Sequence, residues 1–195
     1  LPVPPGFTIT TAACNSYYQN KENILPSILQ EIETAVTTLE KNTGKEFGNT
    51  RIPLLVSVRS GARISMPGMM DTVLNLGMND KIAASMAKLT NNERFAYDSY
   101  RRFIQMYADV VENLGKAPFD KIFEKTKEKF KAKLDTDLTA DQLKEVVIAF
   151  KEEYKKLKKE EFPQDPKKQL LSAVKAVFRS WNNSRAIYYR KMNDI

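Results

Sequence analysis

The residues best suited to chemistry lie in the segment 54–79, where Arg59 directly follows the apolar run Leu54–Val58. The length and β-branched character of this run predict a buried strand, and an arginine at the carboxyl end of such a strand is held rigidly at a rim where ligands bind. The Arg59 guanidinium has a planar fork of donors that matches phosphate oxygens, while Ser60 adds a hydroxyl and Gly61 an uncrowded amide. The pattern favours a phosphate ligand. On these residues alone, the alternative is that Arg59 pairs with a carboxylate for structure.

Four methionines and one acid follow in the same segment. The methionines could form one soft wall of a flat apolar pocket, although core packing is the more usual role for such residues. We interpret Asp71 as a helix cap rather than a metal ligand, because no second carboxylate is close to it in the sequence. The methionines in question are Met66, Met69, Met70 and Met78.

The stretch Phe95–Tyr107 carries aromatic residues two to four positions apart. Aromatic side chains at such intervals can stack on the bases of a single-stranded nucleic acid, but the spacing equally fits the buried face of a helix. Basic residues within the stretch are confined to Arg101 and Arg102, which provide no charged groove for a phosphate backbone. We therefore expect no nucleic-acid partner.

Composition excludes several further classes of protein. The chain has 195 residues, of which 42% are hydrophobic, with only 7 glycines and 9 prolines, so we expect a folded chain with a sizeable core. No apolar run approaches the roughly 18 residues of a membrane span, so we expect no membrane partner. Histidine is absent, which excludes Ser-His-Asp and Cys-His catalysis and any phosphohistidine formed on these residues. The single cysteine, Cys14, suits a reducing compartment.

The sequence pattern divides the chain near residue 80 into a small α+β part and a helical part. The first part is expected to contain strands at Phe7–Thr10 and Leu54–Val58. The expected helices are one capped by Thr10 or Thr11 and running to Tyr18, one from Pro26 until Asn42–Gly44 ends the pattern, and one at Met69–Leu76 that Gly77 stops. From Asp80 onward only helical periodicity is visible. The expected helices there are 81–89, 93–114, 119–134, 140–159, 166–181 and 184–192.

The run Val58–Thr72, with the sequence VRSGARISMPGMMDT, resembles the pyruvate, phosphate dikinase family. The motifs PGFTITT, RFAYDSYRRF, DTDLT and AVFRSW also look like that family, so the resemblance covers nearly the whole chain. It implies a helix-rich α+β fold that forms part of an ATP-grasp nucleotide-binding domain. The family hands a phosphoryl group from ATP to a histidine on a swivelling carrier domain, and the complete reaction converts ATP, phosphate and pyruvate to AMP, diphosphate and phosphoenolpyruvate with Mg²⁺.

The resemblance places Arg59 on the family's ATP-phosphate-binding arginine, with Ser60, Gly61, Arg63 and Met70 as candidate neighbours of the ATP site. It assigns no catalytic residue and no Mg²⁺ ligand to this chain, because the family's lysine loop and its metal-holding carboxylates fall outside the matched region. We therefore expect a piece of a larger cytoplasmic or organellar enzyme, inactive alone, whose parent is a homo-oligomer. The start of the chain, which has neither an initiator Met nor a signal-peptide pattern, agrees with this expectation.

Within the ATP-grasp domain, we expect residues 1–79 to form the ATP-facing lobe, 80–163 a helical insertion, and 164–195 a helical return to the first lobe. Residues 171–195 carry five cations and one acid, so we expect several of these cations to lack a local partner. Arg185, which follows the Asn182–Ser184 turn, is the best candidate for docking the carrier domain. Pairing of these cations within the lobe is the structural alternative. The rival function is a noncatalytic helical module that binds protein partners through this basic end.

Overall fold

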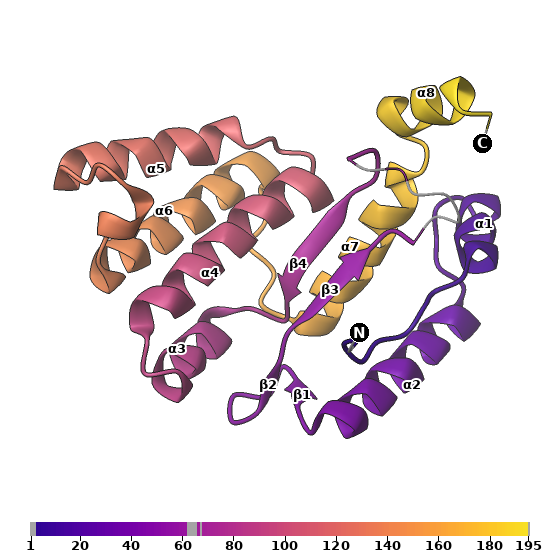
Figure 1. Cartoon of the computed structure of the whole chain (residues 1–195), viewed down its shortest axis with the longest axis horizontal. Helices are drawn as coiled ribbons and strands as arrows, with labels where there is room; N and C mark the ends of the chain where they lie inside the picture. The colour runs from indigo at the N-terminus through magenta and orange to yellow at the C-terminus, as the bar shows by residue number, and fades with distance from the viewer. Residues whose placement is uncertain (1–2, 62–65, 67, 195) are drawn as a thin grey trace. The chain divides into compact units, whose positions relative to one another are not determined.

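The computed structural model describes residues 3–61, 66 and 68–194 (Figure 1), and the chain divides into two compact units, Leu1–Leu54 and Leu55–Ile195. The first unit contains helices α1 (Thr11–Gln19) and α2 (Pro26–Thr43) and the two-residue strands β1 (Glu46–Phe47) and β2 (Pro53–Leu54), which pair in parallel. Both helices agree with the sequence analysis. Thr10 caps α1 by accepting a hydrogen bond from the Ala13 amide, and Gly44 ends α2 at a φ of 64°.

Two strands expected in the first part of the chain differ from the structure. Residues 7–10 form no strand, because Thr10 is used as the cap of α1 and β1 pairs with β2 instead. The apolar run 54–58 is interrupted at Leu55, so that its beginning lies in β2 and its remainder in β3 (Val56–Arg59). Arg59 is nonetheless the last residue of a strand, as predicted.

In the second unit, β3 pairs with β4 (Thr72–Leu76) in an antiparallel hairpin. Arg59 lies opposite Thr72 at one end of the hairpin, and Val56 lies opposite Leu76 at the other. The register shifts between these pairs, and Asn75 adopts a φ of 57°, a left-handed conformation that asparagine tolerates well. β4 therefore contains an extra residue relative to β3.

The helix expected at Met69–Leu76 is wrong, because this segment supplies β4. Val73 and Leu76 are buried on the hairpin, whereas Thr72 and Leu74 are exposed. The three-residue spacing of the buried pair matches a helical face, but it arises here from the extra residue in β4. Gly77, predicted as a helix stop, has a φ of 100° in the turn after the strand. Pairing with β3, which lies earlier in the chain, therefore determines the conformation of this segment in place of its local helical propensity.

The helices after residue 80 agree closely with the expected ranges, apart from two local changes. The helix expected over 119–134 ends at Phe130, where Lys131 caps it in a left-handed conformation with a φ of 54°. α4 passes into a π-helical turn, η1, where a continuous α-helix was expected. Thr139 and Gln142 form the predicted capping box of α6, and Asp165 with Pro166 begins α7 as predicted. The elements are α3 (Asp80–Leu89), α4 (Glu93–Met106), η1 (Tyr107–Val111), α5 (Ala117–Phe130), the 3₁₀ turn η2 (Asp135–Asp137), α6 (Ala140–Lys158), α7 (Pro166–Ser180) and α8 (Ser184–Met192).

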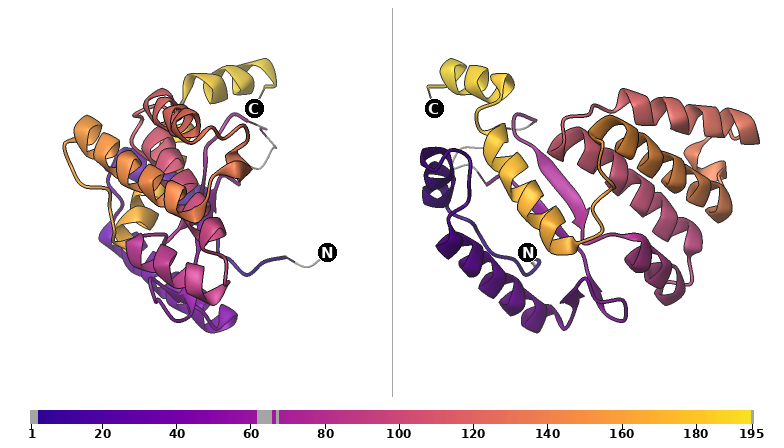
Figure 2. Two further views of the ribbon diagram at one scale, coloured as in Figure 1. Left: turned by 90° about the vertical axis from the view of Figure 1, so that its left-hand side faces the viewer. Right: turned by 180° about the vertical axis from the view of Figure 1, so that it is seen from behind.

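Helices cover the hairpin in the second unit. α7 runs across β3 and β4 and contacts both, as the view from behind shows (Figure 2), while α4 and η1 contact β4 and belong to a group with α3, α5 and α6. Phe162, which joins α6 to α7, lies at the centre of an aromatic cluster with Tyr100, Phe103, Tyr107 and Tyr154. This core confirms the prediction of a helix-rich α+β chain. In the described part of the chain, no helix is long and apolar enough to cross a membrane.

One end of the hairpin is fixed by a buried glutamine of α7. The Gln169 side chain is fully buried; its Oε1 accepts from the Gly77 amide at 3.0 Å, and its Nε2 donates to the carbonyl oxygens of Met78 at 2.9 Å and Pro163 at 2.7 Å. Every polar atom of this amide group is thus paired with backbone. The exit from β4 and the start of α7 are joined at this point.

A second polar network holds the helices α4 and α5 to η2. Arg101 is buried, with its Nε 2.8 Å from Asp98, its Nη2 3.4 Å from Asp135, and its guanidinium 4.0 Å from the centre of the Phe123 ring. Arg94 donates to the backbone oxygens of Leu138 and Asp135. Two of the motifs that carry the family resemblance, RFAYDSYRRF and DTDLT, therefore contact each other.

Candidate functional site

Arg59 ends β3 with an exposed side chain. Among the residues that the structure describes, none forms a hydrogen bond, ion pair or ring contact with its guanidinium. The alternative in which Arg59 pairs with a carboxylate for structure therefore finds no described partner. A cation that is held by a paired strand and has no partner among the described residues is suited to bind an anionic ligand.

The next residues leave the strand open to approach. Ser60 is half-buried and Gly61 is exposed, and a Cβ added at Gly61 would meet nothing within 4 Å. The Gly61 amide is thus uncrowded, as predicted. Arg63, the third predicted neighbour of the ATP site, lies outside the described residues.

The segment that returns toward β4 is held by the junction of α7 and α8. The Asn183 side chain donates from Nδ2 to the carbonyl oxygen of Met69 at 2.9 Å, and the Asp71 amide donates to the Ser180 hydroxyl at 3.2 Å. Thr72, the residue after Asp71, lies opposite Arg59 in the hairpin. Two side chains more than 100 positions away in sequence thus fix the strand end beside Arg59.

Asp71 is not the helix cap that the sequence predicted, because a strand and not a helix follows it. Its carboxylate lies 3.7 Å from the Arg185 guanidinium, and the side chain is 29% exposed. Partial burial raises the pKa of Asp71 above its usual range, and the nearby negative charge of Asp109 raises it too, while Arg185 acts in the opposite direction. Burial and the charge of Asp109 therefore disfavour the ionised form of Asp71, whereas Arg185 favours it.

The four methionines do not share one wall. Met70 is half-buried and precedes β4 at the Arg59 end, so it remains a candidate neighbour of the site. Met78 is fully buried and follows β4 at the opposite end of the hairpin, and Met66 is also buried. For Met66 and Met78, core packing is the role that burial supports.

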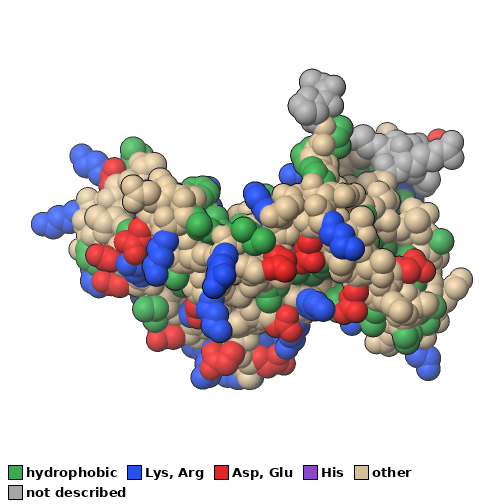
Figure 3. Space-filling model, turned by 90° about the horizontal axis from the view of Figure 1, so that it is seen from below, with side chains coloured by type: hydrophobic (Ala, Val, Ile, Leu, Met, Phe, Trp, Pro, Cys, Tyr) green, Lys and Arg blue, Asp and Glu red, His purple; other side chains and the backbone are tan. Residues whose placement is uncertain are grey.

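Three of the five cations near the carboxyl terminus have partners within the unit, which corrects the expectation that several had none. Arg179 donates to the carbonyl oxygen of Val111 in the π-turn at 3.1 Å, and Arg190 stacks over Trp181 with 4.0 Å between its guanidinium carbon and the ring centre. Arg185 pairs with Asp71 but remains 63% exposed. Basic and acidic side chains also lie interspersed on the face shown in Figure 3.

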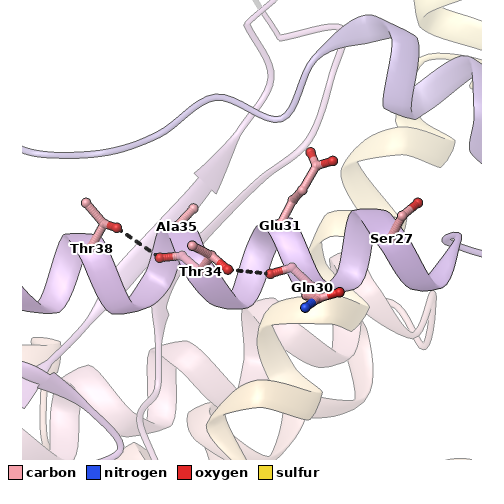
Figure 4. Close-up of a pocket in the computed structure, with 6 residues that line it drawn as sticks. All are labelled: Ser27, Gln30, Glu31, Thr34, Ala35 and Thr38. Atoms are coloured by element: carbon pink, nitrogen blue, oxygen red, sulfur yellow. Dashed lines mark hydrogen bonds between the residues drawn. The ribbon is translucent and has the colours of Figure 1, made fainter.

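The described residues do not fit a Mg²⁺ site. No group of three or more Asp, Glu, Cys or His side chains in residues 3–61, 66 and 68–194 could hold a metal ion. A hollow of about 480 Å³ does lie along α2, but its lining comes from that helix alone (Figure 4). The Thr34 and Thr38 hydroxyls on it donate to backbone oxygens of their own helix, and none of the predicted site residues lines it. It brings together no convergent polar groups from several elements, which a ligand site needs.

Sequence analysis missed Ser180 and Asn183 as parts of this site. Ser180 ends α7, while Asn183 lies in the turn that was recognised as a helix boundary and caps α8 by accepting from the Ala186 amide at 2.7 Å. A capping residue gives no local indication of a second bond to Met69. Only the packing of α7 on the hairpin brings the two segments together.

Comparison with known proteins gives a consistent result. The profile of the family described as "Pyruvate phosphate dikinase, AMP/ATP-binding domain" matches residues 21–195. Pyruvate, phosphate dikinase of Clostridium symbiosum is 60% identical over 196 residues, which cover 100% of this chain and 22% of that protein.

Two further relatives match almost as completely. The chloroplastic pyruvate, phosphate dikinase of Mesembryanthemum crystallinum is 50% identical over 100% of this chain and 20% of its own length. The pyruvate, phosphate dikinase of Entamoeba histolytica is 48% identical over 98% of this chain and 22% of its own length. The chain thus spans about a fifth of the length of the curated relatives that it matches.

Proposed function

Since this chain belongs to the pyruvate phosphate dikinase AMP/ATP-binding domain family, we propose that Arg59 binds the phosphates of ATP during phosphoryl transfer. The observation that carries the proposal is the exposed guanidinium at the end of β3, which no described side chain neutralises. Transfer of a phosphoryl group depends mainly on positioning and on stabilising negative charge, so the site needs no nucleophile of its own. This agrees with the absence of histidine from the sequence.

The proposed reaction of the whole enzyme consumes ATP, phosphate and pyruvate and yields AMP, diphosphate and phosphoenolpyruvate. A histidine on a carrier domain of the same parent chain takes the phosphoryl group from the nucleotide and later passes it to pyruvate. The chain alone is expected to bind Mg·ATP weakly and to be inactive. It would supply only one side of the nucleotide site, whereas tight binding requires two sides that close on the ATP. Mg²⁺, when bound, would neutralise phosphate charge, and its ligands are proposed to lie outside this chain.

The proposed domain layout is that of an ATP-grasp domain, with residues 1–79 as ATP-facing lobe, 80–163 as helical insertion and 164–195 as return segment. The contacts of α7 with β3 and β4 support the return of the last segment to the first lobe, and the grouping of α3 to α6 supports the insertion. We further propose that the full-length protein is a homo-oligomer in the cytoplasm. The chloroplastic relatives suggest an organelle as the alternative location.

We also propose that Arg185 contributes to docking of the carrier domain. Its 63% exposure and the 3.7 Å separation from Asp71 leave donors of the guanidinium available to a second acid. A weak contact steered by charge suits a domain that must dock and then leave. The rival interaction module would use the same surface, but it should bind its partner without ATP.

The test of the ATP site is Arg59→Ala in the full-length enzyme, assayed separately in the ATP and pyruvate half-reactions. The ATP half-reaction should lose about 2 to 4 kcal/mol of transition-state stabilisation, as expected for one preorganised donor. The pyruvate half-reaction should keep nearly its full rate. Arg51→Ala, at another exposed arginine, is the matched control and should leave both rates within about twofold. Equal damage to both half-reactions by Arg59→Ala would refute the assignment.

A further inference from the structure

The Asn183 side chain forms two bonds that serve different elements. Its Oδ1 accepts from the Ala186 amide at 2.7 Å and caps α8, whereas its Nδ2 donates to the Met69 carbonyl at 2.9 Å. Serine or aspartate would cap a helix equally well, because both offer an acceptor oxygen. Aspartate, however, has no donor for the Met69 carbonyl, and the serine hydroxyl, which can donate, is one bond shorter than the amide and does not extend as far.

Ser180 reinforces the contact from the last turn of α7. Its side chain is buried, its hydroxyl donates to the Val177 carbonyl at 2.7 Å, and the same oxygen accepts from the Asp71 amide at 3.2 Å. Together the two polar side chains hold the carbonyl of Met69 and the amide of Asp71. Both backbone groups lie just before Thr72, the partner of Arg59 in the hairpin.

We propose that Asn183 is a positioning residue for the ATP half-reaction, which it supports by fixing the start of β4 against Arg59. This inference rests on the proposed role of Arg59. The amide of Asn183 ties the strand end to α8, the helix that also carries Arg185. The Arg59 side chain has no described partner to hold it, so its position depends on the strand pair from which it projects. Loss of the Asn183 bond leaves Arg59 present but less well oriented.

The experiment separates the two bonds of Asn183 in the full-length enzyme. Asn183→Asp and Asn183→Ser both retain an acceptor for the cap of α8, but aspartate has no donor for the Met69 carbonyl and the shorter serine side chain places its hydroxyl out of reach of it. Asn182→Ser is the matched control, because it makes the same change one position earlier, at an exposed residue. Far-UV circular dichroism and thermal melting report whether α8 and the fold are retained. The kcat and the KM for ATP are then measured in the ATP half-reaction.

Both Asn183 variants should lower kcat of the ATP half-reaction about tenfold, as expected for one lost hydrogen bond, while the melting temperature stays close to that of Asn182→Ser. The KM for ATP should change less than kcat. In a double-mutant cycle, adding Asn183→Ser to Arg59→Ala should cost much less than Asn183→Ser costs alone, because Asn183 acts through Arg59. A merely structural role would give additive losses.

The outcomes distinguish this inference from the function on which it rests. If Arg59→Ala slows the ATP half-reaction but the Asn183 variants behave like Asn182→Ser, the positioning role is refuted and the ATP site stands. Additive losses in the cycle, or a fall in melting temperature parallel to the loss of rate, would also refute it. If Arg59→Ala itself leaves the ATP half-reaction unchanged, the proposed function fails first.

Discussion

The two ends of the β3–β4 hairpin are held by polar side chains of the same helix region, but to different degrees. At the Met78 end, every polar atom of the Gln169 amide is bonded to buried or half-buried backbone. At the Arg59 end, two hydrogen bonds fix the strand, the Arg185–Asp71 pair is loose, and the Arg59 guanidinium has no described partner. A side chain whose hydrogen-bonding groups are all paired, such as Gln169, indicates a structural role. An arginine on a paired strand with no described partner, such as Arg59, indicates a place for a ligand.

Two arginines of the second unit show the same difference. Arg101 is buried and is satisfied by Asp98, Asp135 and the face of Phe123. Arg59 is exposed, and its guanidinium has no partner among the residues that the structure describes. The residue type alone therefore predicts neither the structural role of Arg101 nor the ligand-binding role of Arg59, because the role depends on the partners around the side chain.

The largest effect on stability is expected at the saturated end. Gln169→Leu leaves the Gly77 amide and the carbonyls of Met78 and Pro163 without partners, and should lower the free energy of unfolding of this chain by about 3 kcal/mol or more. Urea denaturation measures the change. Lys168→Leu, at the exposed neighbouring position, should shift it by less than about 0.5 kcal/mol. Comparable losses in the two variants would show that the buried amide is dispensable.

A smaller effect, on rate and not on stability, is expected from Arg185→Glu in the full-length enzyme. Charge reversal should slow phosphoryl transfer from ATP to the carrier histidine about tenfold at low salt, and the defect should shrink as salt screens the contact. Lys191→Glu makes the same charge change at another exposed residue of α8 and should have little effect. A variant that loses ATP affinity or melts several degrees lower would assign Arg185 a structural role instead.

The comparison also explains which features the sequence could predict. The helices from α3 to α8 follow from local periodicity and caps such as Thr139 and Asp165, and the position of Arg59 follows from the apolar run before it. β4 could not be recognised, because it exists through pairing with β3 and carries a left-handed Asn75 that no strand pattern includes. The roles of Asn183 and Ser180 could not be predicted for the same reason, since the backbone groups that they bind lie more than 100 positions away.

A still smaller effect is expected for the pH dependence of stability at the Arg59 end. Burial raises the folded-state pKa of Asp71 above its usual value of 3.8, so the folded chain binds a proton there more readily than the unfolded chain. The carboxylate therefore costs stability as pH rises from about 3.8 through the folded-state pKa.

Asp71→Asn should remove this slope, so that the variant gains stability relative to the parent chain as pH rises through that window and keeps the gain above it. Urea denaturation at a series of pH values gives the difference, with the exposed Asp194→Asn as control. A variant that becomes relatively less stable with rising pH would mean that the ion pair with Arg185 outweighs burial.

The most direct test of the distinction between the two ends is the free energy of unfolding of Arg59→Ala in this 195-residue chain, measured by urea denaturation beside the unsubstituted chain. An arginine that is held for a ligand and has no structural partner should be removable with a change of less than about 0.5 kcal/mol. A loss above about 1.5 kcal/mol would show that Arg59 stabilises the fold through a buried or paired interaction, and would contradict its assignment to the phosphates of ATP.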